Sequence, residues 1–113
     1  MVETEQFDFT APSGDAYTVR RLTYRERKDV MRKATKIQMI TDPKLKETKT
    51  EQTIDIYTMQ EQMAAKCIIK APWLAEGKRA VVEDLDKIKS QDAEEIDKFI
   101  DGTNFPKKDV EEN

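Results

Sequence analysis

The sequence predicts an α+β fold, in which an N-terminal two-stranded β-hairpin packs on a bundle of three to four α-helices. Period-2 alternation around a dense turn signal, at residues 6–22, predicts the hairpin. Apolar residues then recur at helical spacing in two long segments, 24–40 and 51–69. A shorter segment with acids at its start, 91–101, predicts the last helix.

The hairpin is the first element. Phe7 and Phe9 alternate with polar residues, and Tyr17 and Val19 supply the apolar side of the return strand. The turn signal between them is Pro12-Ser13-Gly14-Asp15. A two-stranded hairpin is marginal in water, so we expect it to lie on the helices that follow.

The first helix begins with a Thr-x-x-Glu capping box at Thr23 and Glu26. Its apolar arc extends to Ile37, which predicts a helix from about Tyr24 to about Ile40. On the opposite arc, the sequence predicts a basic stripe, formed by Arg25, Lys28, Arg32 and Lys36. Pro43 ends the helix, and the polar residues 42–50 are expected to form a loop.

The second helix is predicted from about Glu51 to Ile69, before Ala71-Pro72. Its apolar residues occupy two adjacent sides, so we expect it to be covered from two directions. One cover is the rest of the domain, and the other is the hairpin or another molecule. One of these two sides is formed by Ile56, Met59, Met63 and Cys67.

The C-terminal third continues with a loop around Trp73 and a turn at Gly77. Residues 81–88 are compatible with a short helix or an extended segment. Ser90 is expected to cap the last helix, about Gln91–Asp101. Gly102 is predicted to end it. The chain of 113 residues should form one domain over 1–106, with a disordered tail at 107–113.

Several function classes are disfavoured by composition. The chain has no histidine, and its single cysteine, Cys67, is expected to be a buried structural residue. Its glycine-containing loops do not match a phosphate-binding pattern, and its carboxylates at 84–97 look solvated. We therefore expect no enzyme, no metal and no cofactor. No apolar run of membrane-spanning length and no signal-peptide pattern occurs, so we expect a soluble cytoplasmic protein without membrane contact.

Charge is distributed unevenly along the chain, although its net value is only −3. Residues 20–40 carry +6, whereas 1–19 carry −4 and 71–113 carry −5. These segments either neutralise one another in the fold or present a basic face to an acidic partner. A sequence pI of about 5.1 makes nucleic acid an unlikely ligand, and base-specific recognition is not indicated.

Two further features are candidates for protein binding. Met59 and Met63 give the second helix a soft surface that can adapt to several partners, although ordinary core packing is the simpler interpretation. Trp73 either anchors a partner or seals the end of the core. A homo-oligomer is also compatible with the sequence.

The chain resembles the small tail assembly chaperones of long-tailed bacteriophages over about residues 7–105. The resemblance depends on the order of elements and on the segment 17–27, which reads YTVRRLTYRER. It depends also on Asp84-Leu85-Asp86 before a short final helix that ends in Phe99-Ile100.

The resemblance implies a non-enzymatic role in virion assembly, in the cytoplasm of the host cell. Proteins of this family bind and solubilise the tape-measure protein and promote assembly of the tail-tube protein around it. For this chain we expect an apolar groove on the second helix at Ile56, Met59 and Met63, with the basic stripe as its rim. Trp73 is a further candidate for contact with the partner. The alternative is a small regulator that grips nucleic acid or an acidic protein through the basic stripe.

Overall fold

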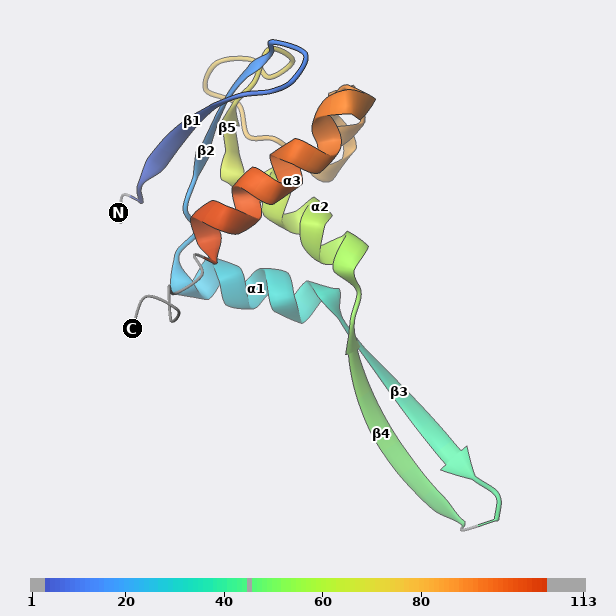
Figure 1. Cartoon of the computed structure of the whole chain (residues 1–113). Coiled ribbons are helices and arrows are strands. Elements are labelled where there is room, and N and C mark those ends of the chain that lie inside the picture. The colour runs from blue at the N-terminus through green and yellow to red at the C-terminus, as the bar shows by residue number, and fades with distance from the viewer. Residues whose placement is uncertain (1–3, 45, 106–113) are drawn as a thin grey trace, which may run out of the picture.

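The computed structural model describes residues 4–44 and 46–105, and it confirms the α+β class (Figure 1). The predicted disordered tail, 107–113, lies outside the described residues. In chain order the elements are β1 (Gln6–Thr10), β2 (Ala16–Arg20), α1 (Tyr24–Ala34), β3 (Thr35–Asp42), β4 (Glu47–Ile54), α2 (Ile56–Cys67), β5 (Ile68–Lys70), the 3-10 helix η1 (Val82–Lys87) and α3 (Ser90–Asn104).

The predicted N-terminal hairpin is present as β1 and β2, paired antiparallel with Phe7 opposite Val19. Gly14 lies in its turn at φ 95°, a conformation that glycine adopts at little cost. Strand β5 pairs with the other edge of β2 and completes a three-stranded sheet in the order β1-β2-β5. The prediction that the second helix continues to Ile69 was therefore wrong, because Ile68 and the next two residues are recruited into the sheet.

A single core lies between this sheet and the three α-helices. Its fully buried side chains come from β2, from α1 to α3 and from the segments that join them. The largest are Tyr17, Leu22, Ile68, Ile96, Val19 and Val30. As expected, Cys67 is buried in this core.

The predicted capping box at the start of α1 is confirmed. The Glu26 backbone N–H donates to the Thr23 hydroxyl (3.2 Å), and the Glu26 carboxylate accepts from the Thr23 backbone N–H (2.9 Å). The same carboxylate accepts two bonds from the Arg20 guanidinium, at 2.8 and 2.6 Å. Glu26 therefore fixes the end of β2 against the start of α1.

Two buried polar residues attach α3 to the N-terminal hairpin and to the segment that joins it to α1. Asp92 accepts from the backbone N–H (2.9 Å) and the hydroxyl (2.5 Å) of Ser13, in the β1–β2 turn. At the other end of α3, the Asn104 side-chain oxygen accepts from the Leu22 N–H (2.7 Å). The expectation that Asp92 is solvated was wrong, because the turn brings Ser13 over it and buries the carboxylate.

The predicted ends of the last helix also differ from those observed. Lys89, and not Ser90, occupies the N-cap position, without a side-chain cap bond. Gly102 lies inside α3, which continues to Asn104 because the buried Asn104 side chain holds the final turn against the core.

The main departure from prediction is a protruding β-hairpin, here called the arm, formed by residues 35–54 (Figure 1). The predicted first helix ends at Ala34, and both the 42–50 loop and the start of the predicted second helix belong to the arm. Its β-branched residues favour strand, and its apolar residues find no core to pack on. With the arm included, the radius of gyration is 17.7 Å, compared with about 13 Å for a compact domain of this length.

Candidate binding groove

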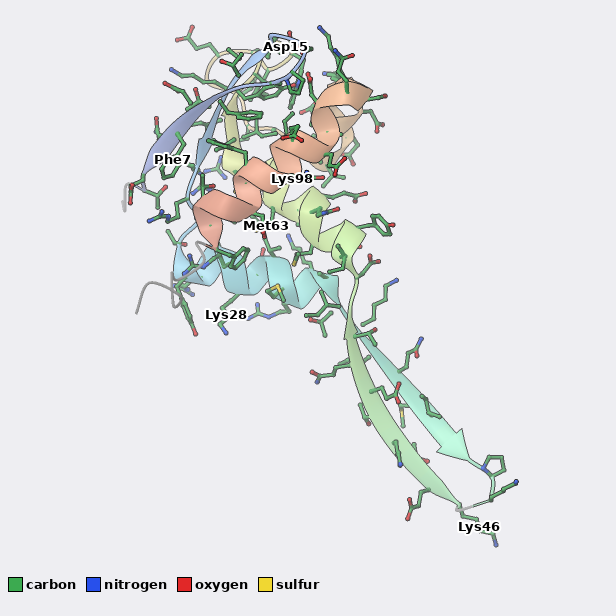
Figure 2. All side chains as sticks on the ribbon, viewed as in Figure 1. Phe7, Asp15, Lys28, Lys46, Met63 and Lys98 are labelled. Carbon is green, nitrogen blue, oxygen red and sulfur yellow. The ribbon has the colours of Figure 1, made fainter. Side chains whose placement is uncertain are left out.

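A groove of about 550 Å³ lies between α2 and α3. Residues of both helices line it, together with the residue that follows α3: Met59, Gln60, Met63, Glu94, Asp97, Lys98, Ile100, Asp101 and Phe105. Figure 2 labels one residue from each helix, Met63 on α2 and Lys98 on α3. Because the two helices are parts of the folded core, the groove is held by their packing.

The floor of the groove is apolar. Met63 and Ile100 are 4% and 3% exposed, so they belong to the core and show only a small surface to the groove. Met59 is half-buried against the same core, and Phe105 is 42% exposed at the end of α3. The unbranched methionine side chain adapts to differently shaped partners, so this floor fits an apolar ligand surface of variable shape.

The rim of the groove is acidic and comes from α3. Glu94, Asp97 and Asp101 line it beside one cation, Lys98, whose ammonium lies 3.4 Å from the Glu94 carboxylate. Burial raises the pKa of Asp97 above its usual value. Within the described chain, the Asp97 carboxylate has no hydrogen bond or ion pair, so a cation brought into the groove would find it available.

The structure places the apolar residues that were predicted to bind a partner in three different settings. Met59 and Met63 line the α2–α3 groove, whereas Ile56 stands 53% exposed at the start of α2 and is not among its lining residues. Trp73 is half-buried, and its indole N–H donates to the Tyr17 hydroxyl (3.0 Å). This contact, with the rings edge to face, places Trp73 at the end of the core.

The predicted basic stripe does not border the α2–α3 groove. Arg25, Lys28 and Arg32 line a separate hollow of about 460 Å³ with Tyr24, Glu26, Asp29 and Lys66. In Figure 2, Lys28 lies on the side of α1 that faces away from α3. Lys36 is not on a helix but on β3, with its ammonium 3.1 Å from the Asp55 carboxylate. The α2–α3 groove therefore has an acidic rim in place of the expected basic one.

The basic hollow is partly neutralised by its own acids. Asp29 lies 3.1 Å from Lys66 and 3.3 Å from Lys33, and hydrogen bonds from these two ammonium groups lower the pKa of its carboxyl. The Lys28 ammonium lies over the Tyr24 ring, 5.2 Å from its centroid. In the described part of the chain, Arg25 and Arg32 form no ion pair, so the charges of these two residues are not neutralised within the hollow.

The described residues offer little for covalent or metal chemistry. Burial raises the pKa of the Cys67 thiol to about 12, and the Asn104 amide is its polar neighbour (3.5 Å). Between residues 4 and 105, leaving out 45, no group of three or more metal-ligating side chains comes together. Over the same residues no helix has the length and apolarity needed to cross a bilayer.

No protein-family model, curated protein or solved structure matches this chain. Sequence reasoning missed the α3 half of the groove, Asp97 and Phe105 above all. The signal was present, because Ala93, Ile96 and Ile100 place the apolar face of α3 and leave Asp97 at its border.

Proposed function

We propose that the protein is a non-enzymatic assembly chaperone that holds an amphipathic helix of its client in the α2–α3 groove. The observation that carries the proposal is an apolar floor, of which Met59 and Phe105 are the more accessible part, beside an unpaired, half-buried carboxylate, Asp97. In helix-in-groove recognition the apolar face of the ligand helix lies in the groove, and complementary charges at the rim fix its register.

The dimensions of the groove suit a short stretch of helix. Its wall on α3, together with Phe105 directly after the helix, spans residues 94–105, which corresponds to about 17 Å, or three helical turns. A client helix would place apolar residues at i, i+3, i+4 and i+7 on Met59 and Phe105. Because the rim is acidic, the flank of that helix should carry lysine or arginine next to Asp97.

We propose the tape-measure protein as the client, because residues 17–27, and Asp84-Leu85-Asp86 before the last helix, resemble bacteriophage tail assembly chaperones. Its long helices repeat apolar surface many times, and a reversible contact along each segment would keep it soluble. Assembly of the tail-tube protein around the tape measure would then displace the chaperone.

The experiment measures binding of helical segments of the tape-measure protein encoded in the same genome. Met59→Asp places a charge on the floor, and Asp97→Lys reverses the rim. We expect each to weaken binding at least about tenfold, as the loss of one good interface contact does. Met63→Asp is not used, because Met63 is 4% exposed and the change would disrupt the core.

The matched control for the rim variant is Glu76→Lys, a reversal of charge on an exposed loop residue outside the groove. We expect it to bind as the parent does. If folded Met59→Asp and Asp97→Lys variants both bind with unchanged affinity, the groove is not the binding site and the proposal fails.

The alternative function is binding of nucleic acid or an acidic protein in the basic hollow, supported by the unpaired charges of Arg25 and Arg32. Contacts to phosphates would make affinity fall steeply between low and physiological salt, whereas an apolar groove is much less sensitive. An Arg25→Glu, Arg32→Glu double variant that loses binding while Asp97→Lys keeps it would replace the chaperone proposal with this one.

A further inference from the structure

The arm lacks the support that a two-stranded sheet usually needs. Its strands pair over eight residues, from Thr35 opposite Ile54 to Asp42 opposite Glu47, and it extends away from the helices (Figure 1). Every residue of β4 is exposed. An isolated hairpin is marginal in water and gains stability when further strands join it, so a strand added to the arm would stabilise it.

The two faces of the arm differ in charge. One face is uncharged and carries exposed Ile37, Met39 and Ile54 among threonines and Gln52. The other face carries Lys36 of β3 and the charged residues of β4. On that face Lys49 lies opposite Ile40, and Glu51 lies opposite Gln38. Among the described residues neither Lys49 nor Glu51 forms an ion pair, so β4 carries two opposite charges that are not neutralised within the arm.

The hydrogen-bonding pattern between β3 and β4 determines which backbone groups of β4 are free to pair with another strand. The Asp55 N–H donates to the Ala34 carbonyl (2.8 Å), which makes 34 and 55 a hydrogen-bonded pair. In an antiparallel ladder these pairs alternate, so the backbone groups of odd-numbered β4 residues face β3. Those of Thr48, Thr50 and Gln52 face outward along the free edge.

We propose that two copies of the chain pair through these β4 edges, antiparallel, about a two-fold axis at Thr50. The Thr50 residues then form a hydrogen-bonded pair with each other, and Thr48 pairs with Gln52 of the second copy. Lys49 of each copy lies opposite Glu51 of the other, in a non-hydrogen-bonded pair where side chains are closest. The product is a four-stranded sheet in the order β3-β4-β4-β3, with the uncharged faces of both copies on one side.

The charges select this register. A shift by two residues in one direction places Lys49 opposite Lys49 and Glu47 opposite Glu51. A shift in the other direction places Glu51 opposite Glu51. Like charges directly opposite each other destabilise a strand pair, so these neighbouring registers are disfavoured. The β3 edge offers less, because Lys36 on that strand is already engaged with Asp55 at 3.1 Å.

Site-specific cross-linking tests the pairing in the full-length chain. Thr50→Cys places two thiols on residues whose Cα atoms are about 5.5 Å apart in a hydrogen-bonded pair, within disulfide range. Thr48→Cys is the matched control, because in the proposed register the Cα atoms of residue 48 in the two chains lie about 14 Å apart. The buried Cys67 does not compete. We expect mild oxidation to link Thr50→Cys and not Thr48→Cys. Linking of a Met39→Cys variant instead would place the interface on β3 and overturn the proposal.

Charge reversal tests the ion pairs by sedimentation velocity over a range of concentrations. Lys49→Glu and Glu51→Lys should each weaken the dimer about tenfold, because two favourable cross-strand pairs become repulsive. A mixture of the two variants restores complementary charges and should form the heterodimer, as the double variant should restore the homodimer. Lys78→Glu, on an exposed loop residue, is the control and should leave the dimer unchanged. A chain that stays monomeric at every concentration, or that dimerises equally with all variants, contradicts the proposal.

Discussion

Glu26→Gln is the substitution that probes most directly how the sheet is held to the helices. The Glu26 carboxylate accepts two bonds from Arg20 and one from the Thr23 N–H, at 2.6 to 2.9 Å. The hydrogen bonds from Arg20 lower the pKa of Glu26 to about 2, from a usual value of 4.5. Glutamine keeps the shape of the side chain and removes the charge.

The size of the effect follows from that pKa. Each unit of difference between folded and unfolded chains corresponds to about 1.4 kcal/mol, so ionised Glu26 contributes about 3 kcal/mol to the free energy of unfolding. Because the folded pKa is the lower one, the contribution is complete above pH 4.5. It is lost as the pH falls towards 2, where the folded state also takes up the proton.

The assay is urea unfolding of the parent and of Glu26→Gln between pH 2 and pH 7. We expect a difference of about 3 kcal/mol at pH 7 that shrinks to less than about 1 kcal/mol at pH 2. Glu61→Gln, an exposed carboxylate on α2, is the control and should change stability little at either pH. A Glu26→Gln difference that is the same at pH 2 and pH 7 would refute the role of the ion pair.

Three further predictions concern other parts of the fold. Asp92→Ala should lower the free energy of unfolding, measured in urea, by about 3 kcal/mol, because Ser13 loses its buried acceptor. The control Asp86→Ala, at an exposed residue, should change it by less than about 0.5 kcal/mol. At pH 8 the Cys67 thiol, with a pKa raised to about 12 by burial, should react with Ellman's reagent about a thousandfold more slowly in the folded chain than in urea; equal rates would contradict its burial. Replacing residues 36–53 by a short turn should leave the rest of the chain folded, because the Ala34 carbonyl and the Asp55 N–H already meet at 2.8 Å. The free energy of unfolding should change by about 1 kcal/mol or less. Loss of the cooperative unfolding transition in circular dichroism would show that the arm is part of the core.

The parts of the fold that the sequence predicts correctly are those in which pattern and burial agree. The hairpin has a turn signal flanked by alternating residues, and Tyr17 and Val19 are buried as expected. The capping box at Thr23 and Glu26 predicts the first residue of α1, Tyr24, correctly. These signals are local, and local hydrogen bonds satisfy them.

The arm was missed because its pattern does not distinguish strand from helix. Ala34 and Ile37 fit a helical arc, whereas Ile37 and Met39 fit strand alternation, and only the structure shows which period applies. Strand β4 has no apolar face, so its sequence ETKTEQTI resembles a loop. Its signal was the alternation of threonines with charged residues, because threonine favours strands.

The acidic rim of the groove was missed because it depends on tertiary packing. Helical spacing places Arg25 and Lys28 on one arc of α1, but it does not show which neighbour that arc meets. In the structure α3, and not the basic face of α1, lies beside Met59 and Met63. Burial of Asp92 has the same origin, since its acceptor role depends on Ser13, 79 residues away.

The most direct test of the proposed client groove uses methionine methyl groups as probes. Four methionines lie in the described chain: Met59 and Met63 in the groove, Met31 on α1 and Met39 on the arm. The protein, labelled with ¹³C in the methionine methyls, is titrated with helical segments of the tape-measure protein and followed by NMR. We predict that the methyl signals of Met59 and Met63 shift on binding, whereas those of Met31 and Met39 do not. Binding that moves only Met31 or Met39, or no binding by any segment, would contradict the proposed groove.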